Sequence, residues 1–116
     1  GWRIHPIQKI WKFHSGVDIA AYGGSDIISA LSGTVITARW HDSYGYYVVV
    51  YHGDGLSTLY AHASKLLVKE GDYVSRGQVI ALVGSTGSST GNHLHFEVRI
   101  NGETRDPLDY LPNKFG

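Results

Sequence analysis

Two histidines lie two positions apart in the segment His93-Leu94-His95-Phe96-Glu97-Val98-Arg99-Ile100. This segment alternates polar and apolar side chains, which predicts a half-buried β-strand with its apolar side toward the core. On such a strand both imidazoles point to the same face, about 6.5–7 Å apart at the backbone. They could therefore converge on one small target, such as a metal ion with its bound water.

A second candidate pair, His14 and Asp18, has a spacing of four residues. The glycine and the β-branched residues around them argue against a helix, in which both would share one face. In a straight strand they would lie about 13 Å apart at the backbone. That is too far for both side chains to reach within about 2 Å of one zinc ion. A shared metal site would thus require the chain to bend, and Ser15-Gly16 is where it can. Taken alone, this pattern is more typical of a capping aspartate and a surface histidine.

A further histidine, His62, is predicted to lie at a strand end. The runs 46–52 and 57–62 are expected to form a hairpin, because the Asp54-Gly55 pair between them is a strong turn signal. A histidine at the end of the second strand is well placed at the rim of a site, and could equally be an ordinary exposed residue. We expect His41 and His52 to lie in loops or at strand ends with no chemical role.

The composition favours strands joined by tight turns. The chain has 116 residues, with 15 glycines, eight tyrosines and a hydrophobic content of 42%. This length suits a single domain covering residues 1–116, in which residues 1–13 form an aromatic and basic N-terminal arm. We therefore predict a small all-β domain of antiparallel strands that form two packed sheets, with the active-site groove on one sheet and loops as its walls.

Charge and cysteine content exclude several classes of function. The formal net charge is zero, which argues against a general nucleic-acid binder. No apolar run is long enough to span a bilayer. There is no cysteine, so any metal must be bound by His, Asp or Glu. We expect the chain to be a processed or excised monomeric domain of a larger protein.

Residues 68–78 have the sequence pattern V-x-x-G-D-x-V-x-x-G-Q, which also occurs in biotinyl and lipoyl carrier domains. Such carriers need an exposed lysine at a hairpin tip, and no lysine lies in a fitting turn here. Shared hairpin turn chemistry explains the match better. The Gly/Ser/Thr-rich loop 84–92 is not a phosphate loop, because the Lys-Ser/Thr pair of that motif is missing.

Taken together, these motifs resemble the catalytic domain of the LytM/lysostaphin-type zinc metallopeptidases, peptidase family M23. The combination of H-x-x-x-D with H-L-H-F-E is specific, and matching segments run through nearly the whole chain. They are residues 13–20, 33–35, 60–62, 71–74, 77–79, 84–87 and 93–99. The resemblance implies a LytM/lysostaphin-like fold related to the barrel-sandwich hybrids.

The resemblance also implies one Zn²⁺ ion with His14, Asp18 and His95 as ligands, flanked by His62 and His93. Spacing alone does not decide which of His93 and His95 binds the metal, and the choice of His95 rests on the resemblance to the family. Three protein ligands leave the fourth position open for water, whose pKa zinc lowers to about 7. One flanking histidine can then move a proton and the other can stabilise the oxyanion, and which does which stays open. The polar neighbours Asn92 and Glu97 could hydrogen-bond the ligands from outside, but the sequence does not establish this role for either.

The family substrate is bacterial peptidoglycan, cut in glycine-rich bridges or in stem-peptide cross-links. The opening residues 1–6, Gly-Trp-Arg-Ile-His-Pro, resemble the lead-in of members that cut D-amino-acid cross-links. We therefore expect a cross-link endopeptidase that works outside the cytoplasm, as an envelope protein or a phage lysin. The alternative is a degenerate member that binds and activates another cell-wall hydrolase. Such scaffolds usually lack one or more zinc ligands, whereas all five positions are intact here.

Overall fold

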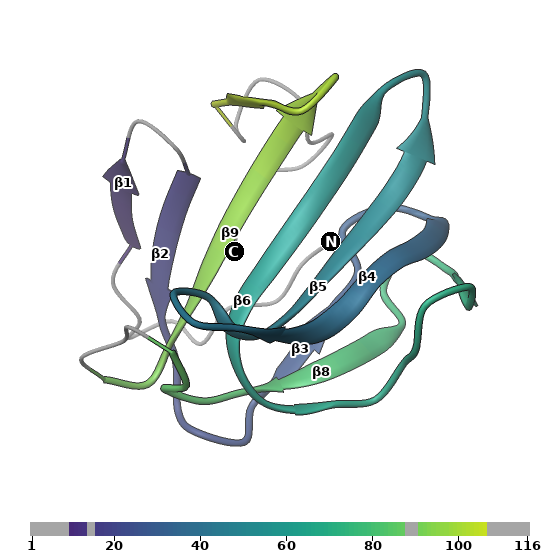
Figure 1. Ribbon diagram of the computed structural model, residues 1–116. Helices are drawn as coiled ribbons and strands as arrows, with labels where there is room; N and C mark the ends of the chain where they lie inside the picture. The colour runs from purple at the N-terminus through teal and green to yellow at the C-terminus, as the bar shows by residue number, and fades with distance from the viewer. Residues whose placement is uncertain (1–9, 14–15, 88–90, 107–116) are drawn as a thin grey trace.

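The computed structural model describes residues 10–13, 16–87 and 91–106, which form strands joined by turns and loops (Figure 1). None of these described residues belongs to a helix long and apolar enough to cross a membrane. The strands are β1 (Ile10–Phe13), β2 (Gly16–Ala20), β3 (Asp26–Ile28), β4 (Gly33–His41), β5 (Gly45–Gly53), β6 (Leu56–Leu66), β7 (Tyr73–Val74), β8 (Val79–Val83), β9 (His93–Ile100) and β10 (Glu103–Arg105). The predicted N-terminal arm is thus partly a paired strand, since β1 pairs with β2, and its residues 1–9 lie outside the described part.

All the described strand pairs are antiparallel. The main order is β1-β2-β9-β6-β5-β4-β7, while β10 pairs with β9, and β8 pairs with both β3 and β6. The main run of strands forms one layer, and β3 and β8 form the other. Strand β6 joins the two layers, because it pairs with β9 up to Ala61 and with β8 from Ala63 onward. The predicted all-β antiparallel fold is confirmed, and the two layers expected as separate sheets are hydrogen-bonded to one another through β6.

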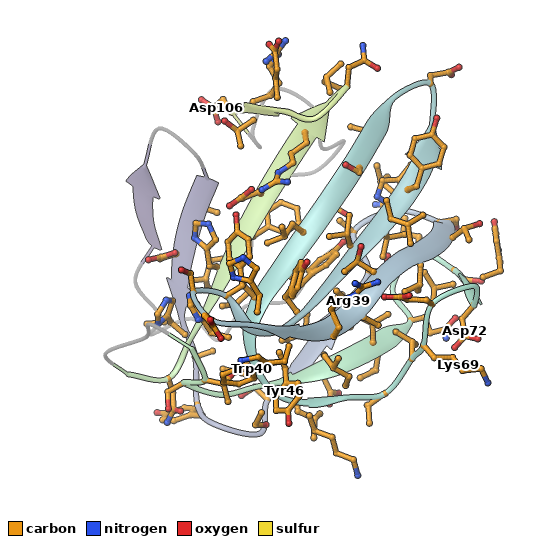
Figure 2. The ribbon with its side chains drawn as sticks, viewed as in Figure 1. Arg39, Trp40, Tyr46, Lys69, Asp72 and Asp106 are labelled. Atoms are coloured by element: carbon orange, nitrogen blue, oxygen red, sulfur yellow. The ribbon has the colours of Figure 1, made fainter. Side chains whose placement is uncertain are left out.

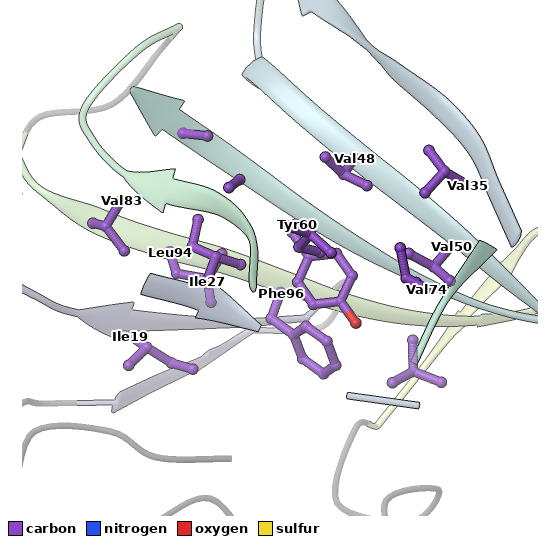
Figure 3. Close-up of a cluster of buried hydrophobic side chains, with 14 of the residues drawn as sticks. Ile19, Ile27, Val35, Val48, Val50, Tyr60, Val74, Val83, Leu94 and Phe96 are labelled. Carbon is purple, nitrogen blue, oxygen red and sulfur yellow. The ribbon is translucent and has the colours of Figure 1, made fainter. Parts of the chain in front are cut away.

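The hydrophobic core lies between these two layers and is shown in Figure 3. Strand β9 contributes Leu94, Phe96 and Val98, each at most 2% exposed. Burying side chains of this size stabilises the fold by about 1.5–3 kcal/mol each. The predicted half-buried strand is therefore confirmed: the apolar face of β9 packs on the core, and its other face bears the two histidines.

The turns that join the strands follow their sequence signals. Asp54 and Asn101 have φ of 54° and 51°, and each is followed by a glycine with positive φ, as a two-residue hairpin turn requires. At the tip of the β4–β5 hairpin, Trp40 and Tyr46 pair edge to face with ring centroids 5.1 Å apart (Figure 2). These turns fix the register of β5, β6 and β9, on which the candidate site is built.

Candidate metal centre and flanking histidines

Asp18 and His95 face each other on neighbouring strands. Residue 18 of β2 is the direct partner of residue 95 of β9, and residue 95 is also the partner of Ala61 on β6. Directly paired residues place their side chains on the same face of a sheet. As a result His95 Nδ1 lies 2.5 Å from Asp18 Oδ1. Gly16 allows this close approach of β2 to β9, because a Cβ there would collide with the carbonyl oxygen of Phe96.

The other nitrogen of His95 is held by a buried carboxylate. His95 Nε2 lies 2.8 Å from Glu97 Oε2, and Glu97 is 2% exposed. Burial alone would lower the pKa of His95, but its hydrogen bonds to Glu97 and Asp18 raise it overall. Burial would likewise raise the pKa of Glu97, yet the hydrogen bonds from His95 and Arg99 lower it overall. Glu97 is therefore a buried anion at neutral pH.

Arg99 and Tyr44 complete the surroundings of Glu97. Arg99 Nε and Nη2 lie 2.8 and 2.7 Å from Glu97 Oε1. The hydroxyl of Tyr44 lies 3.0 Å from Glu97 Oε2 and accepts a hydrogen bond from Arg99 Nη2 at 2.9 Å. The pKa of Tyr44 is raised by burial and by the negative charge of Glu97, so its hydroxyl keeps its proton. The ring of Tyr44 also stacks on that of His95, with centroids 6.2 Å apart.

His62 lies inside β6, and the expectation that it ends a strand is wrong. The strand continues to Leu66, and His62 occupies the point where the register shifts and the partner changes from β9 to β8. Its φ is 65°, a left-handed conformation that is rare for residues other than glycine. A bulge of this kind turns a side chain toward the opposite face, and such features recur at functional sites. Here it brings the ring centroid of His62 to 4.8 Å from that of His93.

Each flanking histidine donates a hydrogen bond from Nδ1 to a backbone carbonyl oxygen. His62 Nδ1 donates to Thr86 O at 2.7 Å, and His93 Nδ1 donates to Gly91 O at 3.0 Å. Each neutral ring therefore carries its lone pair on Nε2, and Nε2 of His93 lies 3.6 Å from Asp18 Oδ2. Burial lowers the pKa of His62 more than the Thr86 carbonyl raises it, which keeps that ring neutral at neutral pH. The pair can accept protons at Nε2, as hydrolysis by an activated water requires.

Among the residues that the structure describes, no three His, Asp or Glu side chains are close enough together to hold a metal ion. The predicted ligand His14 and the predicted bend at Ser15 lie outside the described residues, although Phe13 and Gly16 on either side of them pair across antiparallel β1 and β2. Asp18 and His95 fit a metal site by their chemistry: a carboxylate oxygen and an imidazole nitrogen face each other, and the far ring nitrogen bonds a carboxylate, as in many metal-binding histidines. Two of the three predicted ligands and both flanking histidines are thus brought together.

Some residues of this centre were missed by sequence patterns. Arg99 shares the polar face of β9 with His95 and Glu97, so the alternation could have identified it. Tyr44 lies outside the segments that resemble the family, and Thr86 lies in one of them without any sign of its contact with His62, because each reaches the centre from a loop distant in sequence. A groove of about 670 Å³ runs over β4, β5, β6 and β9 beside this centre; Tyr44 and Arg99 line it together with Tyr47, Tyr51, Leu59 and Asn101. Its lining includes none of Asp18, His62, His93 and His95, so the expected active-site groove on one sheet stays a prediction.

The chain is similar to several known peptidases. It is 44% identical over 108 residues to the DD-carboxypeptidase/endopeptidase Mpg of Neisseria meningitidis serogroup B, covering 93% of this chain and 25% of that protein. It superposes on a zinc-containing peptidase from Vibrio cholerae with a TM-score of 0.83 and 35% identity, covering 90% of this chain and 37% of that one. The catalytic domain of lysostaphin from Staphylococcus simulans gives a TM-score of 0.81 and 34% identity, covering 97% and 90% of the two chains.

These similarities confirm the lysostaphin-like fold and the family resemblance. The chain spans about a quarter of the length of Mpg, which therefore contains further sequence beyond the shared domain. The model of peptidase family M23 matches residues 12–107, which include all five histidine and aspartate positions singled out in the sequence. This protein belongs to peptidase family M23.

Proposed function

We propose that this domain is a zinc-dependent endopeptidase that hydrolyses peptide bonds in bacterial peptidoglycan, above all its stem-peptide cross-links. The observation that carries the proposal is the facing of Asp18 Oδ1 and His95 Nδ1 at 2.5 Å beside the closely spaced rings of His62 and His93. The similarity to a DD-carboxypeptidase/endopeptidase supports the choice of bond, and the similarity to a zinc-containing peptidase supports the metal.

In this proposal His14, Asp18 and His95 would hold one Zn²⁺ ion, which would supply Lewis acidity and lower the pKa of water to about 7. Two neutral histidines and one carboxylate leave the ion a net positive charge, which favours this role. Nδ1 of His95 is the nitrogen that faces Asp18, and so is the one that would bind the metal.

His62 and His93 handle the protons of the reaction. Each ring is anchored through Nδ1, so Nε2 is the atom that exchanges a proton. One ring takes the proton of the attacking water at Nε2 and delivers it to the leaving amine. The other, when it is protonated on Nε2 as well as on Nδ1, donates a hydrogen bond to the developing oxyanion. The peptide bond breaks, water adds across it, and a carboxylate and an amine are released. The two rings lie close enough to serve the same carbonyl carbon.

The proposed substrate also implies the compartment in which the protein acts. Peptidoglycan lies outside the cytoplasmic membrane, so we propose that the domain acts in the cell envelope or after secretion, including release as a phage lysin. It binds the peptide part of the polymer as a monomeric domain of a larger protein.

Digestion of two purified peptidoglycans tests the proposal. One is cross-linked directly through diamino acids and the other through glycine bridges, each with and without chelator, and products are identified by mass spectrometry. We expect chelator-sensitive cleavage of the directly cross-linked polymer. Cleavage of glycine bridges alone would reassign the bond. Cleavage of neither polymer by protein that contains zinc would favour a scaffold that activates another hydrolase.

A further inference from the structure

We infer that Glu97 is a positioning residue, which keeps the proton of His95 on Nε2 and thereby leaves Nδ1 free of a proton for the metal. This inference rests on the proposed function in one respect, the role of His95 as a ligand. It gives a role to Glu97 that follows neither from the family match nor from the spacing of the motifs.

The carboxylate of Glu97 favours one tautomer of His95. Glu97 Oε2 lies 2.8 Å from His95 Nε2, and a carboxylate can only accept a hydrogen bond. A deprotonated Nε2 would direct its lone pair at a buried negative charge, whose repulsion is poorly screened because Glu97 is 2% exposed. Asp18 Oδ1, which lies 2.5 Å from Nδ1, attracts the proton in the same way, so Glu97 favours the Nε2–H tautomer in competition with Asp18. Once a cation lies between Asp18 and Nδ1, the proton stays on Nε2, where Glu97 accepts its hydrogen bond. The lone pair of the ring is then on Nδ1, the atom that faces Asp18.

Arg99 and Tyr44 hold Glu97 in this orientation. Arg99 can only donate, so the contact at 2.9 Å makes the Tyr44 hydroxyl an acceptor from Arg99 Nη2 and leaves its proton for Glu97 Oε2 at 3.0 Å. Arg99 also bonds Glu97 Oε1 through Nε at 2.8 Å. Both oxygens of Glu97 thus accept hydrogen bonds from donors of fixed direction, and the carboxylate cannot turn away from His95 without breaking several of them.

The contacts of Glu97 extend beyond an ion pair with Arg99. Arg99 is satisfied by Oε1 of Glu97 and by Tyr44, whereas Oε2 is directed at the ring of His95. Carboxylates that bond the far nitrogen of a metal-binding histidine typically contribute 10- to 100-fold to metal affinity. We therefore expect Glu97 to act on the metal through His95.

Glu97→Gln is the sharpest variant, because it keeps the shape and removes one acceptor. Its single oxygen is drawn to Arg99, so its NH₂ group faces His95 Nε2 and favours the tautomer with the proton on Nδ1. The matched control is Glu70→Gln, which breaks a carboxylate–arginine contact with Arg39 on the exposed outer part of β4 (Figure 2). Both variants are checked for folding by thermal melting.

Two readouts are made besides activity. In metal-free protein in alkaline buffer, ¹⁵N NMR shifts of the imidazoles report the tautomer of His95. Zinc affinity is measured by competition with a chromophoric chelator. We expect a larger population of the Nε2–H tautomer in wild type than in Glu97→Gln, and zinc binding about 10- to 100-fold weaker in that variant only.

The outcomes separate this inference from the proposed function. A zinc affinity that Glu97→Gln leaves at the wild-type value, or a tautomer population that it leaves unchanged, would overturn the role of Glu97 while the peptidase assignment stands. A wild-type protein that binds no zinc would overturn the proposed metal site, and the tautomer measurement would still decide the orientation of His95. If Glu97→Gln does not fold, Tyr44→Phe decides the question, since it should weaken zinc binding in the same direction but by less, and zinc affinity at the wild-type value would overturn the role of Glu97.

Discussion

The ring of His62 is anchored by Thr86, whose backbone carbonyl accepts a hydrogen bond from His62 Nδ1 at 2.7 Å. Thr86 in turn packs on the β4–β5 hairpin, where its hydroxyl accepts from the backbone N–H of Tyr46 at 3.1 Å. A Cβ at Gly45, whose φ is 68°, would collide with Thr86, and one at Gly87 would collide with Gly45. The position of a candidate proton-transfer residue therefore depends on two glycines that allow a hairpin and a loop to touch.

Gly45→Ala should displace Thr86 and reduce kcat/KM by about 10- to 100-fold, because a small misplacement of a reacting group is costly. The left-handed backbone adds a stability loss of about 1–2 kcal/mol. Zinc content should stay that of wild type, since the altered contact lies at His62 and not at Asp18 or His95. Steady-state kinetics and zinc analysis measure both quantities.

Gly77→Ala is the control for this prediction, because Gly77 has a φ of 85° and a Cβ added there would meet no other atom within 4 Å. It should lose similar stability and retain its kcat/KM. Equal losses of activity in the two variants would mean that backbone strain, not the contact with Thr86, is responsible.

Alanine substitutions should divide the five candidate residues into two groups. His14→Ala, Asp18→Ala and His95→Ala should abolish stoichiometric zinc binding, since each removes a proposed ligand. His62→Ala and His93→Ala should retain zinc and lose peptidoglycan hydrolysis. Metal analysis after dialysis and the digestion assay distinguish the groups, and a zinc-free His93→Ala protein would show that the roles within H-x-H are exchanged.

Gly16→Ala should separate β2 from β9. The added Cβ would collide with the backbone carbonyl of Phe96, which cannot move without disturbing both pairings of β9. Overpacking of this kind costs about 1–3 kcal/mol of stability. Because Asp18 lies two residues further along β2, zinc affinity should fall as well. Urea unfolding and chelator competition measure the two effects; a stable variant that binds zinc normally would contradict this account of the close approach.

Acid should destabilise the protein partly through His52. Its Nδ1 donates to Ser32 O at 2.8 Å, so Nε2 of the neutral ring accepts from the hydroxyl of Thr58, also at 2.8 Å. Burial lowers the pKa of His52 below its ordinary value of 6.5, against the raising effect of the Ser32 carbonyl. The unfolded chain then binds more protons than the folded one just below pH 6.5. This part of the stability is fully present above that pH and is lost as pH falls through the folded pKa.

His52→Gln should flatten this pH dependence, which urea unfolding at a series of pH values measures. His41→Gln is the control, since His41 lies on the surface with its Nδ1 accepting from the backbone N–H of Ser43 at 3.0 Å. If both variants keep the wild-type slope between about pH 5 and about pH 7, His52 does not contribute to acid sensitivity.

Local sequence determined much of this molecule. The polar and apolar alternation of residues 93–100 has a period that only a strand can use, so it fixed which side chains of β9 face the core and which face the site. Asp54-Gly55 and Asn101-Gly102 determined hairpins, because their backbone preferences are set within two residues. The order of the motifs also identified the family, and with it a predicted set of site residues that local physics could not have chosen.

Tertiary structure decided how these parts act together. His62 looked like the last residue of a strand, but β6 continues because a second partner, β8, takes over where β9 leaves. Its left-handed bulge is imposed by that change of partners, which no short-range pattern records. The same holds for Tyr44 and Thr86, which reach Glu97 and His62 across 53 and 24 positions of sequence. Contacts between segments so far apart depend on the register of several strands at once, and that register is set only when the whole sheet packs on its core.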